Sequence, residues 1–514
     1  MDTTMPSTPS DKHESFWIDS APGRRFPSLQ GDVSVDVAVL GGGIAGLTAA
    51  TLLKRAGKRV AVIEAARLVE GVTGHTTAKV TSGHGLIYAE LIKKFGEEGA
   101  RIYAQSNQAA LERIARFVAE EGIDCDFERK SNYIYAETQE ELQSVQDELE
   151  ATQKLGLPVS FVKDTRLPYF TNGAIRYDNQ AQFHPRKYLL HLAESLPGDG
   201  SFVFEDTRAL DVEEGTPHRV MTNKGVVSAQ DVIVATHFPF LDRGLLFARV
   251  HPYREYVVCA RIDEAQDPDG MYINTGSPTR SVRTTPYEGG RLLIVVGEKH
   301  RTGEETDTEQ HYTALEEFAR TSFGVEEFEY RWSTQDNYSI DRVPYIGKLN
   351  PGSDRLYVAT GFSAWGMTNG TLSGMVLSDL ILGIQNPWAE FYDPNRAPSV
   401  GKLIQENLGI PKHWLGARLA PPEVESLSRL ASGEGAIVEV GGEKVAAYRD
   451  EHGTVHAVSP VCTHMGCIVN WNSGEKSWDC PCHGSRFSAE GKVIQGPAVK
   501  DLAKKDFAAA ENPS

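Results

Sequence analysis

The first clear hydrophobic pattern is a strand, a glycine-rich turn, a helix and a second strand near the start of the chain. Residues 35–40 are apolar and largely β-branched, as in a buried parallel strand. Residues 44–56 are rich in Ala and Leu, and Gly57 ends them as a helix C-cap. Residues 59–63 form another apolar run that stops at Glu64. This order predicts the opening of an α/β domain.

Helical and strand-like segments are mixed further along the chain. Helical spacing of Glu, Lys, Gln, Ala and Leu predicts helices at 88–121, 137–155 and 309–323. Strand-like runs occupy 132–136, 203–205, 231–235, 255–261, 291–296 and 356–359, and another helix starts at about Thr368. The mixture predicts an α/β domain with an interleaved α+β portion.

The pattern changes after a proline-bearing stretch at 386–425. Short strands separated by turns follow, in GAIVEV, KVAAYRD and TVHAVSP, and they predict a small all-β module. At the other end, the first 16 residues hold Ser, Thr, Pro and Asp without a basic region before an apolar run. We expect a loose lead-in rather than a secretory signal, and therefore a cytoplasmic protein.

Length and charge narrow the class of protein. At roughly 100–200 residues per domain, 514 residues predict two to four domains. The formal net charge of −18 argues against nucleic acid and anionic membranes as partners. No apolar stretch reaches membrane-spanning length, so no membrane insertion is expected.

The turn after the first strand predicts a dinucleotide site. Gly41, Gly43 and Gly46 have GxGxxG spacing between a strand and a helix, where the backbone can approach a pyrophosphate. The helix N-terminus supplies free N–H groups for that anion. Glu64 ends the next strand, where a carboxylate can bond both ribose hydroxyls. Ile44, Ala45 and Ala65 are the expected neighbours of the cofactor.

A second glycine-rich element favours FAD over NAD. SIDRVPYIGKL precedes LYVATGFSAWGMTNG, which predicts a strand, a turn and a helix N-terminus aimed at the flavin ring. Such a helix end would stabilise the anionic reduced flavin. The candidate contacts here are Asp341, Gly361, Trp365, Gly366, Met367 and Thr368.

Residues 31–390 resemble the D-amino-acid oxidase/sarcosine oxidase superfamily of FAD enzymes. The matching segments are VDVAVLGGGIAGLTAA, AQFHPRKYLLHLA, QDVIVATH and DRVPYIG followed by LYVATGFSAWGMTNGTLSG. The resemblance implies a Rossmann-type flavin domain in three pieces, 31–90, 185–250 and 330–390, with a substrate domain at 91–184 and 251–329. It also implies oxidation of C–N bonds in amines or amino acids by hydride transfer to FAD. Residues 1–30 would be an extension and 391–425 a linker.

The resemblance places the segment GVTGHTTAKVTSGHG, residues 71–85, along the flavin. Some members carry a covalent histidyl–FAD bond in a similar pattern, and His75 stands at the matching position. His75 is therefore either a covalent attachment site or a histidine that contacts the cofactor without a bond. Thr73, Thr76, Thr77 and His84 are the other expected contacts in this segment.

Four cysteines cluster near the C-terminal end. Cys462-Thr-His464 is followed, 15 residues later, by Cys480-Pro-Cys-His483. One Cys and one His from each of two loops is the Rieske arrangement, in which two thiolates hold one iron and two imidazoles hold the other. Zinc is the alternative for two Cys and two His. We predict a Rieske [2Fe–2S] domain over residues 426–508.

This site is similar to that of the respiratory Rieske proteins. Cys467 and Cys482 stand where those proteins have a disulfide, although two unpaired thiols remain the alternative. Ser485 matches a hydroxyl that bonds a bridging sulfide there. Phe487 replaces a tyrosine donor, so we expect a lower reduction potential than in that group.

The combined layout resembles bacterial FAD-dependent oxidoreductases with a C-terminal Rieske domain. It predicts a flavin dehydrogenase that takes electrons from a small molecule and passes them through the cluster to an external acceptor. An NAD(P)H-dependent reductase that feeds an oxygenase, and a redox sensor, are the alternatives. The usual layout of a Rieske oxygenase, with its catalytic domain after the cluster, is not expected, because only about 30 residues follow His483.

Candidate substrate contacts come from two segments of the chain. HPYREYVV, residues 251–258, lies where the family's chain enters the substrate sheet. Tyr253, Arg254 and Tyr256 are candidates to bind a carboxylate or wall the pocket, and Tyr338 is a candidate near the flavin. The alternative is that they are ordinary residues of a half-buried sheet.

Overall fold

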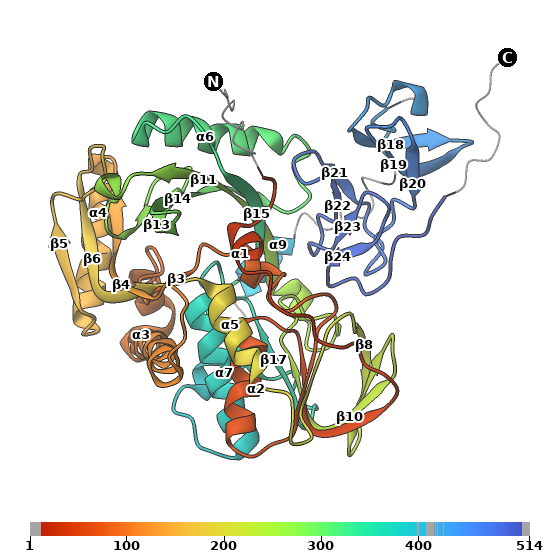
Figure 1. Ribbon diagram of the computed structural model, residues 1–514, viewed down its shortest axis with the longest axis horizontal. Coiled ribbons are helices and arrows are strands. Elements are labelled where there is room, and N and C mark those ends of the chain that lie inside the picture. The colour runs from red at the N-terminus through yellow and green to blue at the C-terminus, as the bar shows by residue number, and fades with distance from the viewer. Residues whose placement is uncertain are drawn as a thin grey trace, which may run out of the picture.

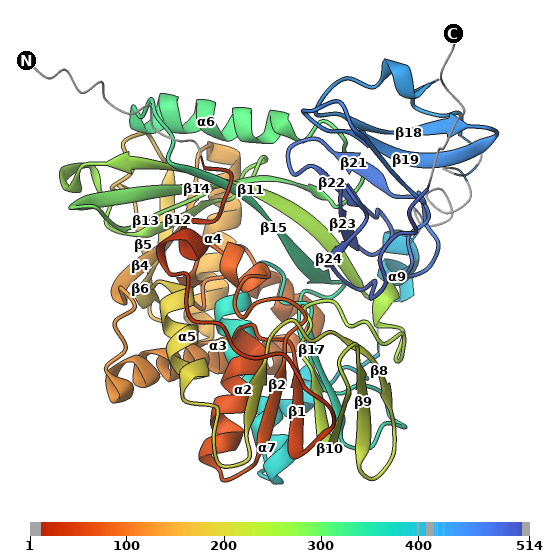
Figure 2. The same ribbon diagram turned by 45° about the vertical axis from the view of Figure 1, so that its right-hand side comes forward.

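A computed structural model describes residues 12–397, 400–407, 416, 418, 420–424 and 426–505. Two large sheets and a smaller β module make up this part of the chain (Figures 1 and 2). Residues 1–11 of the predicted extension, parts of the predicted linker and residues 506–508 of the predicted Rieske domain lie outside the described residues.

The first sheet contains the predicted βαβ unit. Its strand order is β16-β17-β10-β1-β2-β7, and β9 joins β10 while β8 joins β9. Because β1 is paired in parallel with β2 and β10, its residues from Val37 to Leu40 are fully buried, which explains the continuous apolar run. The strands are β1 Val33–Leu40, β2 Val60–Ile63, β7 Phe202–Phe204, β8 Ala209–Glu213, β9 His218–Thr222, β10 Val226–Val234, β16 Tyr345–Lys348 and β17 Leu356–Thr360.

Three helices cover one face of the first sheet: α2 (Ile44–Arg55), α5 (Pro185–Glu194) and α7 (Gly366–Leu382) (Figure 2). Helix α2 packs closely on α7 because small residues face each other. A Cβ on Gly374 would lie 2.6 Å from the Thr48 methyl group, and one on Gly370 would lie 2.6 Å from Ile44. The close packing holds the N-termini of α2 and α7 near each other, at the same end of the sheet.

The second sheet is mostly antiparallel, with the order β15-β11-β14-β13-β12-β4-β6-β3 and β5 beside β6. Helix α6 (Glu309–Phe323) packs on β11 and β14, whereas α3 (Tyr88–Glu121) and α4 (Gln139–Lys154) lie toward β4 and β6 (Figure 1). The strands are β3 Lys79–Val80, β4 Glu128–Ala136, β5 Val159–Val162, β6 Gly173–Gln182, β11 Val250–Ile262, β12 Met271–Asn274, β13 Ser281–Tyr287, β14 Gly290–Arg301 and β15 Tyr330–Ser339.

Two strands join a different sheet from the one their predicted domain implies. Strand β15 was placed with the flavin portion from residue 330, but it pairs along its length with β11 of the second sheet. Strand β3, within predicted flavin residues 31–90, pairs with β6. Both strands connect the two sheets, so their side chains lie at the junction where a substrate would meet a cofactor.

Residues 12–16, expected as the end of a loose lead-in, and the rest of the predicted extension to residue 30 are packed against the body. Helix α1 (Phe16–Ser20) buries Phe16 and Trp17, and Lys12 forms a β-bridge with Tyr330 of β15. The prediction rested on Ser, Thr and Pro content and overlooked the aromatic pair, whose burial stabilises the packing.

The C-terminal module consists of two small sheets. One has the order β18-β19-β20 and the other β21-β22-β23-β24, and the four-stranded sheet lies closer to the rest of the molecule (Figures 1 and 2). The strands of the module are β18 Gly435–Val440, β19 Glu443–Arg449, β20 Val455–Val458, β21 Asn470–Asn472, β22 Ser477–Asp479, β23 Arg486–Ser488 and β24 Val493–Gln495. Two short helices, α8 (Ala389–Tyr392) and α9 (Val400–Asn407), precede the module.

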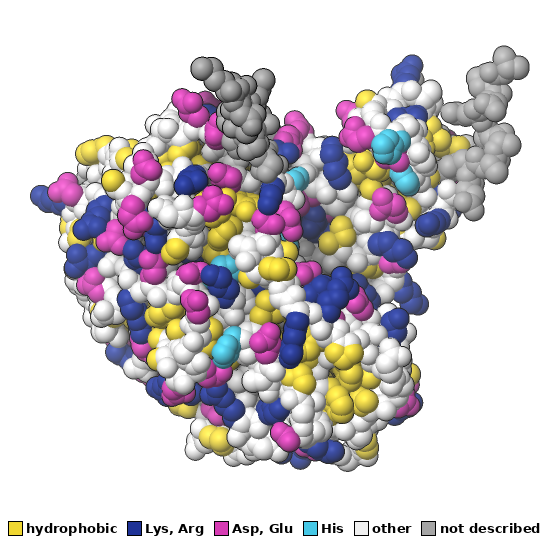
Figure 3. All heavy atoms as spheres, viewed as in Figure 1, with side chains coloured by type: hydrophobic (Ala, Val, Ile, Leu, Met, Phe, Trp, Pro, Cys, Tyr) yellow, Lys and Arg dark blue, Asp and Glu magenta, His cyan; other side chains and the backbone are white. Residues whose placement is uncertain are grey.

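The surface carries both signs of charge. Basic and acidic side chains are interspersed over the face shown in Figure 3, so the net charge of −18 is not gathered into one acidic field there. A notch separates the C-terminal lobe from the body at the top of that view. No helix among the described residues is both long and apolar enough to cross a membrane.

Candidate active site and cluster site

A cavity of about 640 Å³ extends from the glycine-rich turn after β1 to the N-terminus of α7. Its volume, and a lining that runs from the turn at Gly41 to the start of α7, suit the predicted dinucleotide. Gly46 does not line it; a Cβ there would lie 2.0 Å from the Gly41 carbonyl oxygen, so this glycine allows α2 to start directly above the turn. The predicted residues that do line it are Gly41, Gly43, Ile44, Ala45, Glu64, Ala65, Thr73, His75, Thr76, Thr77, Gly366 and Met367.

Glu64 lies at the end of β2, as predicted, and faces this cavity. Its carboxylate accepts hydrogen bonds from the backbone N–H of Gly42 at 2.7 Å and of Ala66 at 3.0 Å. Burial raises the pKa of Glu64, and the two N–H groups oppose that shift. The carboxylate is thus fixed beside the turn, where it can accept further hydrogen bonds from ribose hydroxyls.

His75 ends a short 3₁₀ turn, η1 (Val72–His75), that faces the same cavity. Its Nδ1–H donates to the Gly71 carbonyl at 2.9 Å, so Nε2 carries the lone pair. Burial lowers the pKa of His75 and favours this neutral form. The turn is held from both sides, since Trp332 donates to the His75 carbonyl at 2.8 Å and Trp17 donates to the Thr76 carbonyl at 2.6 Å.

A smaller cavity of about 240 Å³ adjoins the large one. Trp365 and His84 line it, with their rings stacked at 4.6 Å and 15°. His84 is completely buried and bonds Tyr103 and the Thr81 carbonyl, and burial lowers its pKa to about 3. His84 is therefore a neutral structural support for Trp365, and the two stacked rings wall one side of the small cavity.

Glu255 is the residue that sequence reasoning missed. It lies between Arg254 and Tyr256 on β11, and it lines both cavities. The Tyr338 hydroxyl donates to its carboxylate at 3.3 Å, and Tyr338, which was predicted near the flavin, lines the small cavity. A shift in strand register between Arg254 and Tyr256 accompanies this arrangement, and the sequence alone carries no signal for it.

Arg254 faces the C-terminal module rather than a substrate carboxylate. Its Nη2 lies 3.5 Å from the Glu475 carboxylate and donates to the Ser333 hydroxyl. Its Nε and Nη1 have no hydrogen-bond partner among the described residues, and the side chain lines the large cavity. These buried donors fit a polar group of a bound cofactor.

Five further predicted residues line neither cavity. Asp341 forms a buried ion pair with Arg396, at 2.8 and 2.9 Å, and supports the chain between β15 and β16. The Thr368 hydroxyl bonds the Thr81 carbonyl, and Gly361 supplies a left-handed turn before α7. Tyr253 packs on Tyr338, and Tyr256 lies in a stack with His300 and His311. The contacts of these residues are with other parts of the protein, and none of the five faces either cavity.

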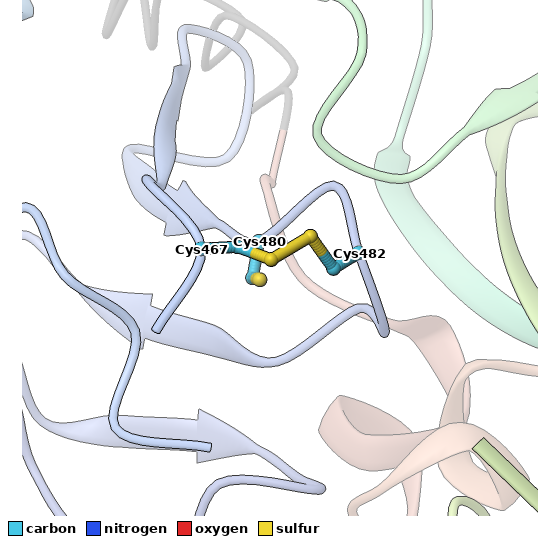
Figure 4. A group of neighbouring side chains, drawn as sticks. All are labelled: Cys467, Cys480 and Cys482. Atoms are coloured by element: carbon cyan, nitrogen blue, oxygen red, sulfur yellow. A yellow bond between two sulfur atoms is a disulfide. The ribbon is translucent and has the colours of Figure 1, made fainter. Parts of the chain in front are cut away.

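The two predicted cluster loops meet at the inner end of the C-terminal module. The thiols of Cys462 and Cys480 are within hydrogen-bonding contact, and the rings of His464 and His483 lie 5.0 Å apart. Cys467 and Cys482 form the expected disulfide between the loops, with the Cys480 sulfur beside it (Figure 4). The disulfide removes those two cysteines from the ligand set and leaves two Cys and two His.

His483 shows most clearly that the residues fit a cluster. Both of its ring nitrogens are buried and have no hydrogen-bond partner among the described residues. Burial lowers its pKa to about 3, so the imidazole is neutral and ready to ligate. The Ser485 hydroxyl bonds the Cys462 thiol, whereas Phe487 is fully buried and offers no hydroxyl.

The ligand side of the module faces the first sheet. The His483 ring lies 5.7 Å from the Phe247 ring and 6.2 Å from the Phe238 ring. His464 donates from Nε2 to Asp242 at 2.9 Å. Gln335, which lines the large cavity, donates to the carbonyl of Gly484 at 2.9 Å, directly after the ligand His483.

The C-terminal module also closes the large cavity. Glu475 and Arg486 line it near His75, and residues 493–499 line it near Arg208. The Arg208 guanidinium donates to the Val493 carbonyl at 3.4 Å. The cofactor cavity is therefore built from two parts of the chain that lie far apart in sequence.

Comparisons with known proteins agree with both sites. Residues 36–380 match the family described as FAD dependent oxidoreductase, and residues 421–506 match the Rieske [2Fe-2S] domain. The chain is 39% identical over 499 residues to the Rieske 2Fe-2S iron-sulfur protein YhfW of Bacillus subtilis (strain 168), covering 96% of this chain and 98% of that protein.

More distant relatives match the first two thirds. Gamma-glutamylputrescine oxidoreductase of Escherichia coli (strain K12) is 25% identical over 376 residues, 70% of this chain and 86% of that protein. The solved structure of glycine oxidase from Geobacillus kaustophilus has a TM-score of 0.61 and 19% identity over 71% of this chain and 100% of that chain. This structural likeness shows the fold.

Proposed function

Because the chain belongs to the FAD-dependent oxidoreductase family and carries a Rieske [2Fe–2S] domain, we propose that it oxidises the C–N bond of an amine or amino acid. The electrons would leave through the chain's own cluster to an external acceptor. Relatives named for gamma-glutamylputrescine and for glycine support an amine or amino acid as the substrate. The small cavity beside the FAD cavity, about 240 Å³, suits a molecule of that size.

One contact carries the proposal that the two cofactors work together. Gln335 has one end in the FAD cavity wall and donates to the backbone of Gly484, next to the ligand His483. Phe238 links the sites by a second route, because it lines the same cavity and its ring faces His483. A cluster at this position would be separated from the FAD cavity by single side chains.

Some residues of the chain would bind FAD, and others would wall the space between FAD and the cluster. FAD, when bound, supplies acceptance of two electrons and their release one at a time, and the cluster carries single electrons. Glu64 and the turn at Gly41 hold the adenosine and pyrophosphate end. The N-terminus of α7 would face the flavin ring, and residues of the C-terminal module would wall the cavity on the side of the cluster.

Anaerobic mixing with glycine, sarcosine, L-proline and gamma-glutamylputrescine, with NADH as the competing donor, tests the proposal. We expect one of the amines to bleach the flavin absorbance, after which the electron paramagnetic resonance signal of a reduced Rieske cluster grows. In a Cys462→Ser variant the flavin should still bleach and the cluster signal should be missing. Bleaching by NADH alone would favour the reductase that feeds an oxygenase and exclude amine oxidation.

The covalent link is a separate part of this proposal. His75 presents Nε2 to the FAD cavity in its neutral, nucleophilic form, which supports a bond to the flavin through that nitrogen. After acid denaturation the yellow colour should stay with the protein pellet, and in a His75→Ala variant it should move to the supernatant. Release of all flavin from the unaltered protein would leave His75 as a non-covalent contact.

A further inference from the structure

Glu255 occupies the place where the two cavities meet. Seven residues line both cavities, and among them Glu255 is the one ionisable side chain. The others are Thr76, Thr77, Val296, Ala364, Gly366 and Met367. Gly366 and Met367 begin α7, so Glu255 faces the point where a molecule in the small cavity would approach the flavin ring.

The strands around Glu255 leave its carboxylate available to a ligand. Its hydrogen bond in the described part of the chain comes from Tyr338 of β15, and the second carboxylate oxygen has room to accept another. Asp336 of β15 adds negative charge, whereas Lys299 of β14 and Lys79 of β3 add positive charge. Burial raises the pKa of Glu255. Burial and the nearby negative charge of Glu255 raise the pKa of Asp336 to about 7.

We propose that Glu255 binds the ammonium group of the substrate and removes its proton before the C–N bond is oxidised. The inference rests on the proposed amine oxidation and adds a residue to it. An amine can give up a hydride only as the neutral base, because its nitrogen lone pair must form the C=N bond as the C–H bond breaks. Most amines are protonated at neutral pH, so a cavity that binds them needs a proton acceptor at this point.

The proposed step is a proton transfer without any change in oxidation state. The ammonium N–H bond breaks, an O–H bond forms on the Glu255 carboxylate, and the electron pair stays on nitrogen. Because the pKa of Glu255 is raised, it lies closer to the pKa of the substrate ammonium group, and the proton transfer is less unfavourable. Lys299 lines the small cavity and is exposed, so this side of the cavity reaches the solvent to which Glu255 can later lose the proton.

Stopped-flow reduction of the flavin from pH 6 to pH 10 tests this role, with whichever of the four amines bleaches the unaltered protein. In Glu255→Gln we expect the second-order rate of reduction to fall by about 10²–10⁴-fold at pH 7. The loss should shrink about tenfold per pH unit as the amine itself becomes neutral, up to an amine pKa of about 10. A merely structural defect would lower the rate by one factor at every pH.

A matched control comes from the neighbouring strand. Glu298 of β14 pairs with Arg280 at 2.9 Å and lines neither cavity, so Glu298→Gln should keep the unaltered pH profile. Parallel pH profiles for Glu255→Gln and the unaltered protein would overturn the role of Glu255 and leave amine oxidation standing. If NADH and none of the amines bleaches the flavin, the proposed function fails, and this inference fails with it.

Discussion

At the residue scale, Gly484 decides how closely the cluster loop approaches the flavin portion. It has a φ of +71°, and a Cβ there would lie 2.6 Å from Pro252 and from the Gln335 amide nitrogen. We expect Gly484→Ala to push the two surfaces apart. If the docked state becomes less stable by about 1.4 kcal/mol, the equilibrium constant for docking falls tenfold. The measurement is the rate of cluster reduction after the flavin is reduced, which should slow while flavin reduction stays unchanged.

Gly491 provides the control for that substitution. It has a similar φ of +84°, but a Cβ there would meet Val458 and Leu502 of the same module. Gly491→Ala should therefore strain the module without moving it off the flavin portion. Equal slowing of cluster reduction in both variants would mean that general damage to the module, rather than the contact of Gly484, sets the rate.

The residues with fixed chemistry were predictable from the sequence, and those with only positional roles were not. The residue types and their spacing are enough to identify the predicted cluster ligands Cys462, His464, Cys480 and His483. Glu255 has no such spacing and acquires its place only when β11, β14 and β15 come together. Tyr253 and Tyr256 on the same strand line neither cavity, since the register of a strand decides which side chains face a cavity.

At the scale of elements, the short helix α1 supports the FAD site from outside. Trp17 is completely buried, and its indole N–H donates to the Thr76 carbonyl in the turn that carries His75. We expect Trp17→Ala to destabilise the protein by about 3–5 kcal/mol and to weaken retention of FAD. Trp17→Phe keeps most of the packing and should cost about 1 kcal/mol through the lost hydrogen bond.

Thermal unfolding and flavin loss under dialysis separate these effects. Trp17→Phe should lower the midpoint of unfolding only slightly but still loosen the cofactor, because the Thr76 carbonyl loses its donor. Undiminished flavin retention in both variants would show that α1 stabilises the fold without supporting the cofactor turn.

Elements with strong local patterns were predicted well. Helix α6 has the expected bounds of 309–323, and the βαβ unit around α2 follows its apolar and glycine pattern. The sheet membership of β15 and β3 was not predictable, because a strand's partner depends on tertiary pairing rather than on its own residues. Helix α1 is only five residues long, and its stability comes from burial and not from helix propensity.

At the scale of the whole molecule, a buried charge cluster joins the C-terminal module to the second sheet. Glu475 lies 3.5 Å from Arg254 of β11 and 3.6 Å from Arg486 of β23, and it accepts a hydrogen bond from Tyr312 of α6 at 2.6 Å. The hydrogen bond from His13, at 3.1 Å, and the charges of the two arginines hold the pKa of Glu475 well below its usual range despite its burial. The module therefore docks through a carboxylate that His13 and two arginines share.

Removal of that carboxylate should separate the two parts of the molecule. Glu475→Gln removes the carboxylate that faces Arg254 and Arg486 but leaves Arg486 its ion pair with Asp479 at 3.0 Å. We therefore expect a cost below the roughly 3–5 kcal/mol of a fully broken buried pair. We expect slower cluster reduction, faster flavin loss and a larger hydrodynamic radius, whereas Glu443→Gln, which breaks a surface pair with Lys505, should behave like the unaltered protein.

The pH dependence of docking follows from the depressed pKa of Glu475. Because the docked pKa of Glu475 is depressed, its stabilising effect is fully present above the usual glutamate pKa of about 4.3 and is lost as the pH falls toward the depressed value. Cluster reduction in the unaltered protein should thus stay fast from pH 8 to pH 5 and slow only in more acid solution. In Glu475→Gln this acid limb should be missing, since the titrating group is gone. An identical acid limb in both proteins would assign the effect to another carboxylate and leave Glu475 without a role in docking.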